Sequence, residues 1–172
     1  MKIRIPIALA AALFMAQAPA FAASPNSPQT TTFTVKARVD ANCTISATDL
    51  DFGSYDPVVL NKIGGAPQDA NTTVSVLCTK GSSPVTVGLN TGTHASRFMS
   101  NGADSLQYEL YSDAPGGTVW GNSGGGLVTW SAFGSIASQG AGISHAVYGR
   151  IPAGQDVSVG NYTDTITATV NF

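Results

Sequence analysis

Charge is scarce in this chain. Of 172 residues, 8 are Lys or Arg and 10 are Asp or Glu, so that only 10% are charged. The basic residues nowhere form the cluster or stripe that binds nucleic acid or an anionic membrane surface. A monomer that stays dispersed by its own charge usually carries more of it. We therefore expect no nucleic-acid partner, and we expect another protein to cover part of this weakly charged surface.

Histidine is also scarce, and no group of residues has the spacing of a metal or catalytic site. The only histidines are His94, in a Gly- and Thr-rich stretch, and His145, in an expected strand. Neither belongs to a set of Cys, His, Asp and Glu with metal-ligand spacing. Asp49, Asp51 and Asp56 lack the ligand spacing and the glycine of a calcium loop. We expect solvated carboxylates, no metal, no cofactor, no catalytic residue and no enzyme activity.

A glycine-rich stretch covers Gly121 to Gly126. A phosphate-binding loop needs a following lysine and helix, and neither is present. The stretch is therefore expected to be a hairpin loop. Trp120 and Trp130 flank it; we prefer a packing role for them, and a sugar-binding platform is the alternative.

Only one long apolar run is present, from Ile5 to Ala18. Lys2 and Arg4 precede it, and Ala20-Phe21-Ala22 offers the small residues that a signal peptidase reads. Residues 1–22 are predicted to be a secretory signal peptide, with a retained anchor as the alternative. We expect no membrane span in the exported chain. That chain has 6 basic and 10 acidic residues, a net charge of about −4.

The chain has two cysteines, Cys43 and Cys78, which lie 35 positions apart in the exported part. An oxidising compartment would pair them, and a loop of this length removes roughly 3 to 4 kcal/mol of unfolded-chain entropy. We predict a structural disulfide. Free or catalytic thiols are the alternative, but there is no CxxC spacing and no histidine nearby in the sequence.

Helical periodicity with caps is missing throughout, whereas short alternating runs recur between Gly, Ser, Asn and Pro clusters. The expected strands lie at 72–78, 85–89, 106–110, 127–130 and 143–151, in addition to a run near each end of the exported chain. About eight short strands in 150 residues indicate one all-β domain, with a sandwich favoured over a barrel.

The run at the carboxyl end, TITATVNF, alternates strictly until the chain stops. Its apolar face consists of Ile166, Ala168, Val170 and Phe172, and Tyr162 continues this face two steps before Asp164. We predict a half-buried strand. Because an unpaired apolar edge is an aggregation site, this strand needs a partner from earlier in the chain or from another molecule.

The run near the other end, TFTVKARV, places Phe33, Val35, Ala37 and Val39 on one face with the same spacing. It also predicts a half-buried strand. The preceding residues 24–29 are rich in Pro and Ser, and they are expected to lie outside the core. The run could be the first strand of its own domain, or it could fill the free edge of another copy.

Several segments occur in a characteristic order over nearly the whole exported chain. They are Asn42-Cys43-Thr44-Ile45, Leu50 to Pro57, Val74 to Cys78, Leu106 to Tyr111, Val119-Trp120-Gly121 and Tyr148 to Phe172. In this combination the chain resembles the spore coat protein U family, which includes the subunits of archaic chaperone-usher pili.

The resemblance implies an immunoglobulin-like β-sandwich that lacks its final strand. Residues 23–40 would form an N-terminal extension that carries a donor strand, and residues 41–172 the domain. A periplasmic chaperone would first lend a strand, and at an outer-membrane usher the extension of the next subunit would replace it. Phe33, Val35, Ala37 and Val39 would be the donor residues. Tyr162, Ile166, Ala168, Val170 and Phe172 would line or border the acceptor groove.

Three functions remain open at this point. The first is a subunit of an adhesive, biofilm-associated surface pilus, in which a single domain suits a shaft or adaptor position. The second is a self-contained secreted coat or matrix protein. The third is a carbohydrate-binding module or small hydrolase, which needs a polar site that the sequence does not display.

Overall fold

The computed structural model describes residues 28–123, 126, 128, 129 and 142–172. The predicted signal peptide, residues 1–22, and Trp130 lie outside these ranges. The chain divides into two units, Met1–Ala37 and Arg38–Phe172. No helix in the described parts of the chain is long and apolar enough to cross a membrane.

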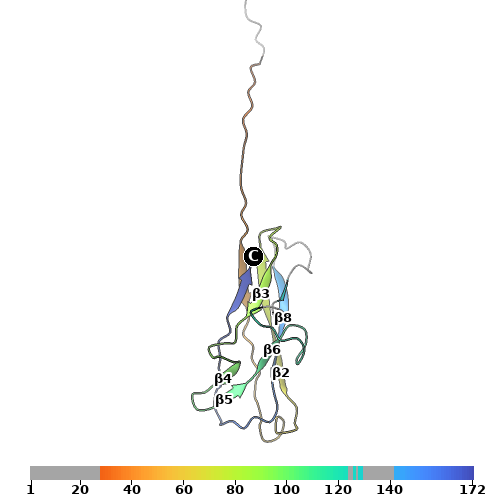
Figure 1. The fold of residues 1–172 in the computed structure, drawn as a ribbon, viewed down its shortest axis with the longest axis vertical. Helices are drawn as coiled ribbons and strands as arrows, with labels where there is room; N and C mark the ends of the chain where they lie inside the picture. Colours follow the sequence, from red (N-terminus) through yellow and green to blue (C-terminus); the bar gives the residue numbers. More distant parts are fainter. Residues whose placement is uncertain (1–27, 124–125, 127, 130–141) are drawn as a thin grey trace, which may run out of the picture. The chain divides into compact units, whose positions relative to one another are not determined.

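The second unit consists of short antiparallel strands, as the alternating runs predict (Figure 1). The described strands are β1 (Cys43–Ala47), β2 (Gln68–Cys78), β3 (Thr86–Leu89), β4 (Phe98–Ser100), β5 (Ser105–Gln107), β6 (Glu109–Tyr111), β7 (Val128–Thr129), β8 (Ile143–Ile151) and β9 (Ala168–Asn171). They form one sheet in the order β1-β2-β8-β6, a second in the order β7-β3-β9, and a β4-β5 hairpin.

The two larger sheets contribute to a single hydrophobic core. The first sheet supplies Val74, Val76, Leu110, Val147 and Ile151, and the second supplies Val87 and Leu89. Trp120 is fully buried among them and donates its indole N–H to the backbone oxygen of Val87, at 2.9 Å. Its role is therefore packing, as we preferred from the sequence.

The run from Leu106 to Leu110 was expected to be one strand and is two. Leu106, Tyr108 and Leu110 all face the core, as the alternation predicts. The backbone, however, changes partner at Tyr108: β5 pairs with β4, whereas β6 pairs with β8. Tyr108 lies between the two strands, so that β5 ends at Gln107 and β6 begins at Glu109.

Both terminal runs are less regular than predicted. Residues 28–42, which cover the described end of the first unit and the start of the second, form no strand. Phe33 in this segment is 85% exposed. The expectation of a half-buried strand there is wrong for the isolated chain, in which no described strand pairs with the segment. At the carboxyl end, β9 covers only Ala168–Asn171, although burial alternates from Tyr162 onward.

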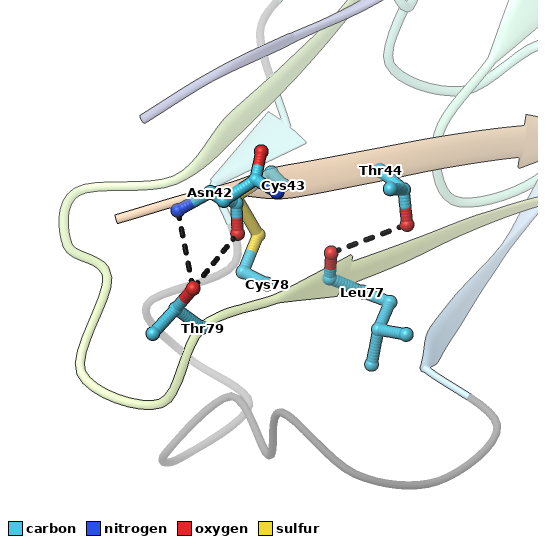
Figure 2. The surroundings of a disulfide bond; sticks show 6 residues. All are labelled: Asn42, Cys43, Thr44, Leu77, Cys78 and Thr79. Atoms are coloured by element: carbon cyan, nitrogen blue, oxygen red, sulfur yellow. Dashed lines mark hydrogen bonds between the residues drawn. A yellow bond between two sulfur atoms is a disulfide. The ribbon is translucent and has the colours of Figure 1, made fainter. Parts of the chain in front are cut away.

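A disulfide joins Cys43 to Cys78, with an S–S distance of 2.00 Å. The two cysteines face each other in the β1-β2 ladder, so the bond ties the first residue of β1 to the last residue of β2. Beside it, the Thr79 hydroxyl accepts a hydrogen bond from the Asn42 N–H, at 3.2 Å, and the Thr44 hydroxyl donates to the Leu77 oxygen (Figure 2).

A buried arginine, Arg97, connects the two larger sheets. Its guanidinium donates hydrogen bonds to the backbone oxygens of Leu89 (3.2 Å), Asn90 (3.1 Å), Leu110 (3.3 Å) and Trp120, and to the Glu109 carboxylate. Leu89 ends β3 and Leu110 lies in β6, so that one side chain holds elements of both sheets. Its charge is balanced by Glu109.

Replacing this arginine should be costly. Arg97→Met leaves several buried carbonyl oxygens and the Glu109 carboxylate without a donor, and we expect a loss of about 3 to 5 kcal/mol of unfolding free energy. Arg150→Met is the matched control, because Arg150 pairs with Asp69 at the surface and should contribute at most about 1 kcal/mol. Urea unfolding of both variants measures the difference. Equal losses would show that Arg97 does not connect the sheets in the way described.

Candidate functional site: a groove beside the last strand

The last strand, β9, has a partner on one edge only. It pairs with β3, and in the order β7-β3-β9 it ends its sheet. β1 ends the other sheet in the same way. The two end strands approach each other, but no ladder between them is present in the described chain.

A groove opens between these two end strands. It holds a cleft of about 560 Å³, with residues 47–50 on one side and residues 162–166 and Ala168 on the other. Its lining includes Val74, Leu89, Leu110 and Val147, which belong to the hydrophobic core. The floor of the groove therefore consists of side chains that belong to the core.

A second cleft, of about 950 Å³, continues the first one. The two share Leu50, Phe52, Met99, Tyr162 and Thr163, and the second extends to Tyr55 and Pro57 on one side and to residues 157–161 on the other. Together the two clefts form a single groove between residues 47–57 and residues 157–168.

Gly149 of β8 provides the space in which Phe52 packs. A Cβ atom at this position would lie 2.7 Å from Cζ of the Phe52 ring and 3.0 Å from Cδ1 of Leu50. Any larger residue would therefore push Leu50 and Phe52 out of their positions in the groove wall. The absence of a side chain at Gly149 thus sets the shape of the groove at its middle.

The predicted groove residues do not all line this groove. Tyr162, Ile166 and Ala168 line it. Val170 is half-buried in β9 and packs against the core, but it is not part of the lining of either cleft. Phe172 follows β9 and is 53% exposed, so the apolar face that was expected to extend to the chain end stops before it.

The predicted donor residues are all exposed in the isolated chain. Phe33, Val35 and Ala37 belong to the first unit, and Val39 lies just beyond it. Their backbone takes part in no strand. The structure therefore leaves these side chains free to pack against another surface.

Asp164 anchors the wall of the groove. Its side chain is 2% exposed, and its carboxylate accepts hydrogen bonds from the Thr93 N–H (2.9 Å), the Thr93 hydroxyl (2.7 Å), the Tyr108 hydroxyl (2.7 Å) and the Thr165 N–H (2.8 Å). Gly92 has φ +92°, and a Cβ atom there would lie 1.9 Å from Oδ2 of Asp164. Only glycine allows the loop and the carboxylate to come this close.

Backbone contacts on either side of Asp164 complete this anchor. The Asn90 N–H donates to the Thr167 oxygen at 3.1 Å, and the Asn90 side-chain oxygen accepts from the Thr167 N–H at 2.8 Å. Ser100 and Thr163 exchange two backbone hydrogen bonds, of 3.0 and 3.2 Å. Residues 163–167 are thus fixed to the rest of the domain without belonging to a regular strand.

The environment of Asp164 also changes the acidity of the groups in this cluster. Burial raises the pKa of Asp164, but the hydrogen bonds from Thr93, Tyr108 and Thr165 outweigh this effect and hold the pKa below its usual value. Burial raises the pKa of Tyr108, and its hydrogen bond to the Asp164 carboxylate raises it further. The raised pKa keeps the Tyr108 hydroxyl protonated, so that it can donate to the Asp164 carboxylate.

The other polar residues singled out in the sequence do not gather into a site. His94 stacks on Phe98 with a centroid distance of 4.0 Å, and its Nδ1 lies 3.7 Å from Oδ1 of Asp164. His145 contacts the edge of Trp120 in the core. The described ranges contain no group of three or more His, Cys, Asp or Glu residues that could hold a metal ion.

Sequence analysis missed Asp164, although the pattern contained a signal for it. The residue is in phase with Tyr162 and Ile166, so it occupies an inward position in an otherwise apolar face. A carboxylate at such a position needs several donors to be buried, and it therefore indicates a hydrogen-bonded anchor. The donors themselves, from Thr93 and Tyr108, come from distant parts of the sequence and gave no signal.

Removing the charge at this anchor should destabilise the domain. Asp164→Asn turns one acceptor oxygen into a donor that faces the donors of Thr93 or Tyr108, and we expect a loss of about 1 to 3 kcal/mol of unfolding free energy at pH 7. Because the pKa of Asp164 is lower in the folded than in the unfolded chain, its contribution is present above about pH 4 and is lost as the pH falls through the folded value.

Urea unfolding between pH 2.5 and 7 measures this effect. The difference between wild type and Asp164→Asn should shrink on acidification. Asp156 is exposed and serves as the control, since Asp156→Asn should change neither the stability at pH 7 nor its pH dependence. A difference for Asp164→Asn that is independent of pH would contradict the assigned role of its charge.

Comparisons with known proteins support the resemblance seen in the sequence. Residues 29–169 match the profile of the Spore Coat Protein U domain. The chain is 35% identical over 187 aligned positions to Protein U of Myxococcus xanthus, and the alignment covers 99% of this chain and 98% of that protein.

Among solved structures, the chain is similar to a chain of the chaperone–tip adhesion subunit pre-assembly complex, CsuC–CsuE, from the archaic chaperone-usher Csu pili of Acinetobacter baumannii. The identity is 24% and the TM-score 0.46, with 78% of this chain covered. The chain spans 40% of the length of that structure's chain. The profile match and the full-length similarity to Protein U establish that the chain belongs to the spore coat protein U domain family.

Proposed function

We propose that this protein is a structural subunit of a surface fibre that assembles head to tail by donor-strand exchange. The second unit would be an immunoglobulin-like sandwich that lacks its final strand. The observation that carries the proposal is the groove beside β9, whose lining includes core residues such as Val74, Leu89 and Val147 and which lies next to a strand edge without a partner in the described chain. An added strand would bond to this edge and cover these residues.

The N-terminal extension supplies a suitable strand. Phe33, Val35, Ala37 and Val39 alternate with polar residues, are exposed, and belong to no strand of their own chain. Burying four such side chains removes on the order of 300 to 400 Å² of apolar surface from water, or roughly 8 to 10 kcal/mol as an upper bound. A junction of this strength can hold two subunits together.

An empty groove of this kind also explains why partners would be needed during export. Before assembly, the open core and the free edge of β9 would promote aggregation. In line with the resemblance to chaperone-usher subunits, we infer that a periplasmic chaperone fills the groove first and that an outer-membrane usher then exchanges its strand for the next subunit's extension. The disulfide fits passage through an oxidising compartment.

The resulting contact is heterologous, because the groove of one copy receives the extension of another. Such a contact does not close on itself and generates a fibre. On this proposal the mature protein is extracellular and part of an adhesive pilus at the cell surface. The low charge of the chain suits a subunit that is packed between neighbours.

The second candidate is a self-contained secreted coat protein. It is favoured by the similarity to Protein U over nearly the full length of both chains. Such a protein would fold and remain stable without a strand from another molecule. The groove should then need no filling, so the stability of the isolated chain separates the two proposals.

Filling the groove within one chain should stabilise it. We expect a variant that carries a copy of residues 30–40 on a flexible linker after Phe172 to be a monomer, with an unfolding midpoint at least several degrees above that of the mature chain. Size-exclusion chromatography and thermal unfolding measure both properties. If the unmodified chain is already an equally stable monomer, the coat-protein candidate is the better one.

A charge on the inward face of the extension should prevent assembly. Val35→Asp places a carboxylate where the proposal needs an apolar side chain, and burying it unpaired would cost several kcal/mol. We expect polymers to disappear while the chaperone-bound subunit persists. Thr34→Asp is the matched control, since Thr34 lies on the opposite face and its variant should still polymerise. Equal polymerisation of both variants would remove Val35 from the donor set.

A further inference from the structure

The loop between β1 and β2 exposes an unusual number of apolar side chains. Val58, Val59, Leu60 and Ile63 are between 63% and 87% exposed. We call residues 57–65 the apolar loop. The groove does not need these side chains, because only Pro57 at its beginning lines the second cleft.

The apolar loop is held in one conformation by the residues that flank it. The Asp56 carboxylate accepts hydrogen bonds from the N–H groups of Val58 and Val59, at 2.9 and 3.0 Å. Asn61 is 2% exposed; its side-chain oxygen accepts from the Asp56 N–H at 2.8 Å, and its amide donates to the Ala66 oxygen at 2.9 Å. The loop therefore presents its apolar side chains from an ordered backbone, which lowers the entropic cost of binding.

The apolar loop lies at one end of the domain, next to one end of the groove. The loop precedes Gln68, the first residue of β2, whereas the disulfide lies at Cys78, the last residue of β2. Eleven residues of strand separate the two ends of the domain by about 33 Å. At the loop end, Tyr55 and Pro57 belong to the groove lining, so the apolar loop directly continues the groove wall.

The direction of an added strand determines which end of the next copy meets this loop. All strand pairs among the described residues are antiparallel, and such pairs are the more stable kind. β9 begins at Ala168, and both Ala168 and Ala47, the last residue of β1, line the groove. From there β9 runs toward the end of the domain at which β1 begins (Figure 1). A donor antiparallel to β9 runs the other way and leaves the groove at the end of the apolar loop.

The short link after the donor residues then brings the next copy close. Only three residues separate Val39 from Cys43, where β1 begins, and four peptide steps span at most about 14 Å. The end of the next copy that carries its disulfide must therefore lie near the apolar loop. At this end Phe172 is 53% exposed and offers an apolar surface.

We propose that the apolar loop is a second contact between successive copies in the fibre, docking on the disulfide end of the copy that donates its strand, around Phe172. This inference rests on the proposed donor-strand exchange. The contact makes the junction two-sided: the strand supplies the attachment, and the loop fixes the angle between neighbours.

Thiol labelling of Leu60→Cys tests this contact in the full mature chain. The rate of modification by a maleimide is compared between polymers and the monomer whose groove is filled by a copy of residues 30–40. We expect the rate to fall about tenfold or more on polymerisation, as for a side chain at the core of an interface. Val119→Cys is the control; Val119 pairs with Tyr111 of β6, the strand at the opposite edge from β1, and its rate should stay within about twofold.

The outcomes separate this inference from the proposed function. If polymers form and Cys at position 60 reacts as fast in them as in the filled monomer, the loop contact is refuted and donor-strand exchange stands. If the wild-type chain forms no polymers, both proposals fail. If Leu60→Cys alone fails to polymerise while its filled monomer keeps the wild-type unfolding midpoint, the loop is needed for assembly and the inference is supported.

Discussion

The structure depends on the fact that a strand has two edges and β9 has a partner on only one of them. β3 satisfies the inner edge, and in the described chain nothing pairs with the outer one. The groove starts at Ala47 of β1 and Ala168 of β9 and continues between residues 47–57 and 157–168, with core side chains in its lining. Its walls then need other means of support, which Asp164, Asn90 and Gly92 supply from inside the domain.

The groove therefore combines a lining of core side chains with a wall that is held by hydrogen bonds. Four polar contacts hold the Asp164 carboxylate, and backbone bonds at Ser100 and Thr163 hold the same segment from the other side. A wall that collapsed inward would cover the core but close the binding surface. Hydrogen bonds are suited to prevent this because they are directional, whereas apolar contacts alone would favour collapse.

The sequence predicted the fold class, the disulfide partners and the inward face of the carboxyl-terminal run, because each depends on local alternation or on a small number of candidates. It could not predict where strands end. The run around Tyr108 keeps its alternation while its backbone changes partner, and β9 begins later than the alternation does. Arg97 and Asn61 were missed because most partners of Arg97 and the partners of Asn61 are backbone groups, which leave no trace in the sequence.

The disulfide has a mechanical consequence. A pull on the chain ahead of Cys43 would, without the cross-link, peel β1 from its first residue, breaking its bonds to β2 one at a time. The Cys43–Cys78 bond instead passes the load at once to β2, the longest of the described strands, which is bonded on both sides by β1 and β8. Force then acts along several ladders in parallel, so the domain resists tension as a unit.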